Sequence, residues 1–352
     1  MVRLSAGRRE VDGGGHGRRS GRSGLRAAGT RGALLVTAPR RQVNPFPLPG
    51  WERTPMRPLR PFDRDAHRDY YVPVDGAEQA FEAFQHEMGD LTGLLEDGRL
   101  VLVTGESGCG KTALVNRCAD WVVRRLGERG LRGVVLDVTG CLPTDQELSI
   151  DQRTTEVCDQ LFDLLVDHDA LRPEAEEQLR EVRDVPRRVF PRLGRALRED
   201  TTLVVLLPSP NELVDEVIRY ARVLRSAKVL FLAESAFLGP DDVADLVRRL
   251  ETWVPPVTLC VGLLDEGDAQ RFAADRLSRH AEAGSYPRMS DEAVELVAKL
   301  CQSVAMLQRF LHGTYEHKLE SGLSYTEADL VSVEDIRAFF NTRSRNGLGI
   351  GP

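Results

Sequence analysis

The sequence lacks any apolar run long enough to cross a bilayer. Its one apolar stretch near the N-terminus, Ala33–Val36, is too short for the core of a signal peptide. These absences argue against membrane-spanning and secreted classes of protein. We therefore expect no membrane span and a cytoplasmic protein.

Paired cysteines are also missing, because the six cysteines form no C-x-x-C motif. Such a pair is the usual mark of a zinc site or a redox dithiol. Most of these cysteines fall on segments with a strand or helix pattern, which indicates reduced, buried thiols. The cysteines are Cys109, Cys118, Cys141, Cys158, Cys260 and Cys301.

Lysine is absent from residues 1–55, which contain eleven Arg and three acidic residues and carry a net charge of +8. The whole chain carries −7, so residues 56–352 carry −15 and offer no general electrostatic footprint for nucleic acid. Residues 1–55 are rich in Arg, Gly and Pro and are expected to be disordered. They are either a basic arm that contacts nucleic acid or an acidic surface, or a segment outside the natural product, since the character of the sequence changes at Met56.

Among the motifs that are present, Gly105–Thr112 reads G-E-S-G-C-G-K-T and fits the phosphate-loop pattern G-x-x-x-x-G-K-[ST]. Its glycines allow successive backbone N–H groups to converge on a phosphate. Lys111 is expected to reach the β- and γ-phosphates, and Thr112 to offer its hydroxyl to Mg²⁺. The predicted nucleotide-binding residues are Gly105, Glu106, Ser107, Gly108, Cys109, Gly110, Lys111 and Thr112.

The neighbouring sequence supports this motif. Arg99–Thr104 is a short apolar run typical of a buried strand, and residues 113–126 place apolar residues at helical spacing. A strand, a glycine loop and a helix are the context in which the motif binds phosphate.

Further apolar runs at 133–138, 202–207, 228–233 and 257–263 alternate with helical patterns. This alternation predicts an α/β fold with a parallel sheet sandwiched by helices. We expect this P-loop domain to span residues 56–263. Asp75 is predicted to cap its first helix, which would run to about Leu95. Residues 264–341 carry only helical periodicity and predict a small all-helical lid, with helix starts at Asp265, Ser290 and Ser332, and residues 342–352 a flexible tail.

This order of elements resembles the AAA+ superfamily and its STAND relatives. Phe62 and the T-G-E-S-G-C-G-K-T-A-L run look most like the secretion-type AAA ATPases related to ExeA. The resemblance implies ATP and Mg²⁺ as cofactors, a moving lid, and a protein partner or homo-oligomer. No N-K-x-D motif for reading guanine occurs, which is consistent with ATP.

The resemblance also implies an acidic pair at the end of the third strand, for holding Mg²⁺ and polarising water. Leu207 and Pro208 stand there instead. Neither side chain can hold a metal or take a proton. Hydrolysis is therefore expected to be slow, absent or dependent on a partner.

Other acids could replace the missing pair. Glu234 ends the fourth strand and is the candidate that we place, with Lys111, among the catalytic residues. The resemblance equally implies a sensor position there, where the family commonly has a small polar residue. Asp137 ends the second strand. The helix acids Glu212, Asp215 and Glu216 fit a solvated helix face better than a catalytic role.

The resemblance further implies an arginine acting in trans before the fifth strand, where Arg248 and Arg249 occur, and one from the lid, where Arg309 occurs. Ordinary surface charge is the better interpretation of all three. Two main hypotheses remain: an ATPase that remodels a partner, and a nucleotide-gated switch that does not turn over. Phosphoryl transfer to a small substrate is a third, but no motif for an acceptor is found.

Overall fold

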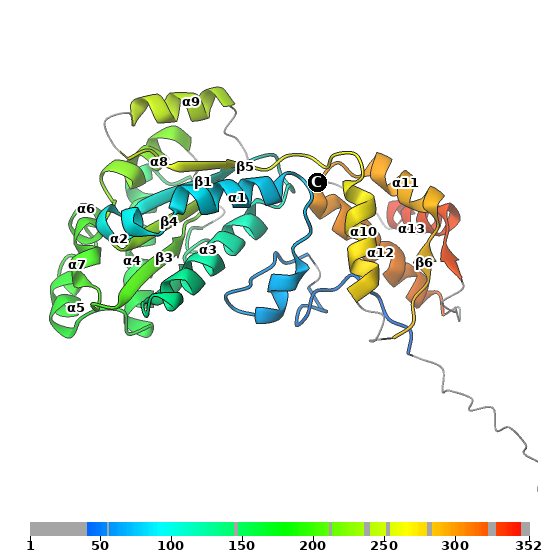
Figure 1. Ribbon diagram of the computed structural model, residues 1–352, viewed down its shortest axis with the longest axis horizontal. Helices are drawn as coiled ribbons and strands as arrows, with labels where there is room; N and C mark the ends of the chain where they lie inside the picture. Colours follow the sequence, from blue (N-terminus) through cyan, green and yellow to red (C-terminus); the bar gives the residue numbers. More distant parts are fainter. Residues whose placement is uncertain are drawn as a thin grey trace, which may run out of the picture. The chain divides into compact units, whose positions relative to one another are not determined.

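The computed structural model describes residues 41–54, 56–143, 147–210, 213–235, 240–250, 254–279, 284–322 and 329–345. Within these ranges, five strands form one parallel sheet in the order β2-β3-β4-β1-β5 (Figure 1). The strands are β1 (Arg99–Thr104), β2 (Arg132–Asp137), β3 (Thr201–Leu206), β4 (Val229–Ser235) and β5 (Val257–Cys260). The strand order makes β4, and not β3, the direct neighbour of β1.

Helices cover both faces of the sheet, because alternate strand residues point to opposite sides. In β1, Leu100 and Leu102 join one hydrophobic cluster, whereas Val101 and Val103 join another. The second cluster packs under α1 (Ala77–Met88), α2 (Thr92–Asp97) and α3 (Lys111–Glu128). The first packs under α4 (Ile150–Asp167), α5 (Pro173–Arg180), α6 (Pro186–Val189), α7 (Leu193–Ala196), α8 (Leu213–Arg222) and α9 (Pro240–Arg249). The predicted sandwich is confirmed.

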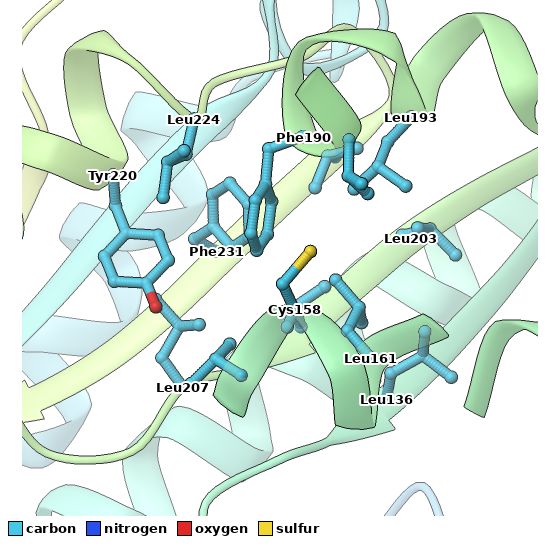
Figure 2. Close-up of a cluster of buried hydrophobic side chains, with 14 of the residues drawn as sticks. Leu136, Cys158, Leu161, Phe190, Leu193, Leu203, Leu207, Tyr220, Leu224 and Phe231 are labelled. Carbon is cyan, nitrogen blue, oxygen red and sulfur yellow. The ribbon is translucent and has the colours of Figure 1, made fainter. Parts of the chain in front are cut away.

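An aromatic group fills the first of these clusters (Figure 2). The Phe231 ring of β4 lies 5.8 Å from Phe190 and 5.4 Å from Tyr220 between ring centroids. Leu207, directly after β3, belongs to the same cluster and is 3% exposed. The end of β3 is therefore part of the hydrophobic core.

The lid helices form a core of their own. They are α10 (Asp268–Arg279), α11 (Asp291–Leu300), α12 (Val304–Glu320) and α13 (Val333–Arg345). Ser290 caps α11 through its hydroxyl, as predicted, but α10 begins at Asp268 and not at Asp265. The structure adds a two-residue parallel ladder to this helical region, β6 (Arg288–Met289) with β7 (Leu330–Val331).

Residues 41–54 correct the expectation of a disordered segment reaching residue 55. Phe46 is fully buried in the lid core, and its ring centroid lies 5.1 Å from that of Tyr315. Leu48 and Trp51 are buried with Leu59 in a further small cluster. A few well-placed apolar side chains are thus enough to hold this stretch, which we call the strap (residues 41–54 and 56–60). Residues 1–40 and Pro55 lie outside the described residues.

The strap connects the lid with the P-loop domain. At one end, the Asn44 and Gln308 side-chain amides hydrogen-bond the carbonyls of His312 and Phe46. At the other end, the Asn116 amide of α3 donates to the Leu59 carbonyl at 2.7 Å. Two elements that are distant in the sequence are therefore joined by one short segment.

The predicted helix start at Asp75 is wrong. Gly76 occupies the N-cap of α1, the helix ends at Met88, and a separate short helix α2 follows. Asp75 is buried at 3% exposure with a left-handed φ of 53°. No helix in the described ranges is long and apolar enough to cross a membrane.

Candidate functional site

The phosphate loop follows β1 and adopts a conformation that needs its glycines. The φ angles of Gly105, Gly108 and Gly110 are 145°, 82° and 74°. The Lys111 ammonium donates to the carbonyls of Gly105 at 2.9 Å and Glu106 at 2.6 Å. Because an ammonium has three N–H donors, one remains for a phosphate oxygen.

The loop opens onto a cavity of about 500 Å³, within the range of small-molecule sites. The predicted residues that line it are Ser107, Gly108, Gly110, Lys111 and Thr112. Gly105 and Glu106 contribute the carbonyls that hold Lys111, and the Cys109 side chain is fully buried in the core. That all eight residues serve nucleotide binding remains a prediction.

Thr112 meets Glu234 at the head of α3. The Thr112 hydroxyl lies 3.0 Å from Oε1 and 2.8 Å from Oε2 of Glu234 and can donate to either. The parallel register explains this contact, since Val103 lies opposite Glu234 and Thr104 opposite Ser235. Burial raises the pKa of Glu234, while the Thr112 hydrogen bond and the Lys111 charge lower it to a smaller extent.

The end of β3 carries no carboxylate. The Leu207 N–H donates to the Leu232 carbonyl at 2.8 Å, and the chain then passes along the cavity at Ser209 and Pro210. The residue that stands where the resemblance implies an acid, Leu207, is therefore part of the hydrophobic core.

The other candidate acids form ion pairs. Asp137 accepts from Arg60 at 2.6 Å and from the Thr139 hydroxyl. Asp215 pairs with Arg249 at 2.5 Å. Glu216 pairs with Arg153 at 3.0 Å, and both side chains are buried. Glu212 lies outside the described residues. Glu234 is therefore the carboxylate that the described residues place in hydrogen-bond contact with Thr112.

The lid contacts the phosphate loop directly. The Ala305 N–H at the start of α12 donates to the Gly108 carbonyl at 3.0 Å. A Cβ on Gly108 would stand 2.8 Å from the Ser303 hydroxyl, so a glycine is needed for this approach. This contact was not predicted, because the S-V-A sequence at residues 303–305 carries no phosphate-binding pattern.

Of the three arginines considered above, Arg309 of α12 lines the cavity. Arg248 and Arg249 form exposed ion pairs with Asp245 and Asp215, as expected of surface charge. The lid arginine thus lies at the candidate site, and the two arginines of α9 are engaged on the surface.

The donor set fits a nucleotide with Mg²⁺. The Thr112 oxygen keeps lone pairs for a cation while its hydrogen points to Glu234. No cluster of three or more His, Cys, Asp or Glu that could hold a metal occurs in the described part of the chain. Mg²⁺ bound to phosphates needs no such cluster, because it takes one or two protein oxygens and completes its shell with phosphate and water.

No protein-family model and no curated protein matches this chain. Among solved structures, it is similar to the Aeropyrum pernix ORC2 protein in its ADPNP-ADP complexes, with 14% identity, a TM-score of 0.51, and coverage of 81% of this chain and 72% of that one. The Thermotoga maritima RuvB Holliday junction branch migration motor gives 12% identity, a TM-score of 0.43, and coverage of 81% and 72%. Domain III of the Thermotoga maritima replication initiation protein DnaA gives 16%, 0.41, and coverage of 78% and 95%. With its five-stranded parallel sheet, its phosphate loop and its helical lid, the chain has the fold of the AAA+ P-loop ATPases.

Proposed function

We propose that this protein binds ATP with Mg²⁺ at the loop Gly105–Thr112 and couples nucleotide state to movement of its lid. The observation that carries the proposal is the Thr112–Glu234 contact, which places a hydroxyl and a buried carboxylate together at the head of α3. The ADPNP and ADP bound by the ORC2 neighbour are consistent with this choice of ligand.

Each group at the site then has a role. The loop N–H groups and the third N–H of Lys111 bind phosphate oxygens. Thr112 holds the cation, which neutralises charge on the phosphates, and Glu234 orients the Thr112 hydroxyl by accepting its hydrogen bond. Glu234 also has the raised pKa of a group that can accept a proton from water, because burial disfavours its charged form.

The lid is coupled to the site through α12. Its N-terminus touches Gly108, and Arg309 lies on the cavity. A triphosphate at the loop would therefore interact with residues of both the sheet domain and the lid. Movement of the lid would change which of its residues are available to bind a protein partner or a second copy of the chain.

The test combines a nucleotide-binding titration with a phosphate-release assay on wild type and Lys111→Ala. Loss of the charge-assisted contacts of Lys111 should weaken ATP binding about 10- to 100-fold. Lys299→Ala is the matched control, because Lys299 is exposed on α11. Equal ATP affinity in wild type and Lys111→Ala would contradict the proposal.

A second candidate is a nucleotide-gated switch that binds ATP without turnover. The apolar end of β3 favours it, since the acid implied there by the resemblance is replaced by a core leucine. Tight ATP binding with no phosphate release from wild type would support the switch over the ATPase.

A further inference from the structure

Two neighbouring surface segments carry opposite charges that form no ion pair within the part of the chain that the structure describes. The first, which we call the acidic row, lies on α5 and consists of the exposed residues Glu174, Glu177 and Glu181. The second, the arginine row, lies on the helical run of α6, η2 (Phe190–Arg192) and α7 and consists of the exposed residues Arg188, Arg192 and Arg195.

The spacing of the two rows matches. Each row spans seven residues, which is about 10 Å along a helix. Side chains three or four positions apart share one face of a helix. The gaps along the chain are three and then four residues in the acidic row, and four and then three in the arginine row. The rows therefore match when they are laid against each other in opposite directions.

The two rows are neighbours on the molecule. An antiparallel bridge joins Leu171 to Leu197, and the Arg172 N–H donates to the Ala196 carbonyl at 2.9 Å. The start of α5 therefore lies beside the end of α7. Both lie at the amino edge of the sheet, since β3 begins at Thr201. The phosphate loop follows the carboxyl end of β1, which is the opposite edge of a parallel sheet.

The core holds the backbone under both rows. Ala175 and Leu179 of α5 are buried, and so are Phe190 and Leu193 of the other run. The Phe190 ring lies 5.8 Å from that of Phe231 in β4, measured between ring centroids. The charged side chains thus project from fixed helical positions, which lowers the cost of ordering them in a contact.

Charges beside the rows are satisfied within the chain. Arg180 pairs with Glu176 at 2.6 Å, and Arg183 pairs with Asp159 at 3.1 Å. The six side chains of the two rows have no such partner among the described residues, although one row is acidic and the other basic. A surface that carries both charges in matching rows is complementary to a second copy of itself.

We propose that two copies of this chain associate through this surface, with the acidic row of each copy on the arginine row of the other. Such a contact is two-fold symmetric and closed, because both copies use the same patch. A second copy pairs both rows. A nucleic acid or an acidic protein segment would pair the arginine row but would be repelled by the acidic row. The contact lies at the edge of the sheet opposite to the phosphate loop, so it does not depend on the proposed nucleotide binding.

The contact should be weak and sensitive to salt. Six ion pairs form across it, and each exposed pair contributes about 1.5- to 5-fold to affinity. Salt screens such pairs, because the Debye length falls as ionic strength rises. The dissociation constant of the dimer should therefore rise about tenfold or more between about 0.05 M and about 0.5 M NaCl.

The experiment is analytical ultracentrifugation of the full chain and of two charge-reversal variants. The first variant carries Arg188→Glu, Arg192→Glu and Arg195→Glu, and the second carries Glu174→Arg, Glu177→Arg and Glu181→Arg. Each variant alone places like charges across the contact, so its dimer dissociation constant should exceed that of wild type by about tenfold or more. An equimolar mixture should recover the association, because one variant then has carboxylates on both rows and the other has guanidinium groups on both.

The control carries Arg125→Glu, Arg129→Glu and Arg337→Glu, which make the same change in charge at exposed positions elsewhere. It should associate like wild type. If a reversal variant does not fold, Gln at the same three positions replaces it and should weaken association in the same direction.

Three results would overturn the proposal: wild type that stays monomeric at low salt, association that either reversal leaves unchanged, or a mixture of the two variants that stays monomeric. Monomeric wild type that binds a short DNA duplex or a glutamate-rich peptide through the arginine row would also overturn it, in favour of another anionic partner.

Discussion

The carboxyl ends of β3 and β4 lie side by side in the sheet and have opposite chemistry. After β3, Leu207 is buried in the hydrophobic cluster that also holds Phe190, Tyr220 and Phe231. Near the end of β4, Glu234 turns to Thr112 of the phosphate-loop helix. In this chain β4 is bonded directly to β1 and β3 is not, and the carboxylate that contacts the phosphate-loop helix comes from β4. Counting strands along the sequence does not reveal it.

The strongest test of this comparison is Glu234→Gln. If β4 carries the general base, the phosphate-release rate should fall by about 10²- to 10⁴-fold, with ATP affinity nearly unchanged. The amide keeps the shape of the side chain but cannot take a proton. Glu295→Gln is the control, because Glu295 is an exposed acid on α11. Wild-type rates in Glu234→Gln would place catalysis elsewhere.

Glu216, the buried acid of α8 behind β3, should act on stability. Glu216→Ala leaves the Arg153 guanidinium buried without its carboxylate, which should lower the free energy of unfolding by about 3–5 kcal/mol. Denaturant unfolding measures the loss. Removing both charges in Arg153→Met with Glu216→Leu should restore much of it. If Glu216→Ala remains folded but no longer releases phosphate, Glu216 of α8 has a catalytic role and the comparison is wrong.

Thr112→Val preserves the shape of the side chain but removes the hydroxyl that contacts Glu234. Loss of one oxygen ligand should weaken Mg²⁺-dependent ATP binding about tenfold. Titrations with Mg²⁺ and with a chelator separate this effect from loop contacts, because affinity without Mg²⁺ should stay the same. An equal loss in both conditions would mean that Thr112 only supports the loop.

The smallest effect concerns pH. Because the pKa of Glu234 is raised in the folded protein, its neutral form stabilises the fold below the ordinary value of 4.5, and this stabilisation is lost as pH rises through the raised pKa. Without Mg²⁺, the difference in unfolding free energy between wild type and Glu234→Gln should therefore shift against wild type as pH rises. A difference that does not change with pH would mean that Glu234 is not buried in this way.

The sequence predicts the repeating parts of the fold well. The runs of Val and Leu in β1 and β3 and the glycine pattern of the loop are local features, and the structure reproduces the five strands to within a few residues. The order of the strands in the sheet depends on contacts between distant segments. For that reason Glu234 could be named from the sequence as a candidate acid, whereas its contact with Thr112 required the three-dimensional structure.

Two other features depend on tertiary contacts. Asp75 has the sequence context of a helix cap. Its backbone instead forms hydrogen bonds with Asp268 and Gly262, which hold it as a buried residue at the edge of the cavity. Phe46 stands in an Arg- and Pro-rich stretch whose composition suggests disorder, and it is held because the lid core has room for one more ring. The average composition of a segment does not reveal that one of its side chains, here Phe46, is buried.

If the lid moves as proposed, the strap sets a limit on how far it can travel. Its anchors, Phe46 in the lid core and Leu59 against α3, are joined by about thirteen residues, which could reach about 45 Å if pulled straight. A small movement of the lid would leave the strap in place. A wide opening would first have to break the contacts of Leu48 and Trp51 in their cluster with Leu59, Tyr70 and Tyr71.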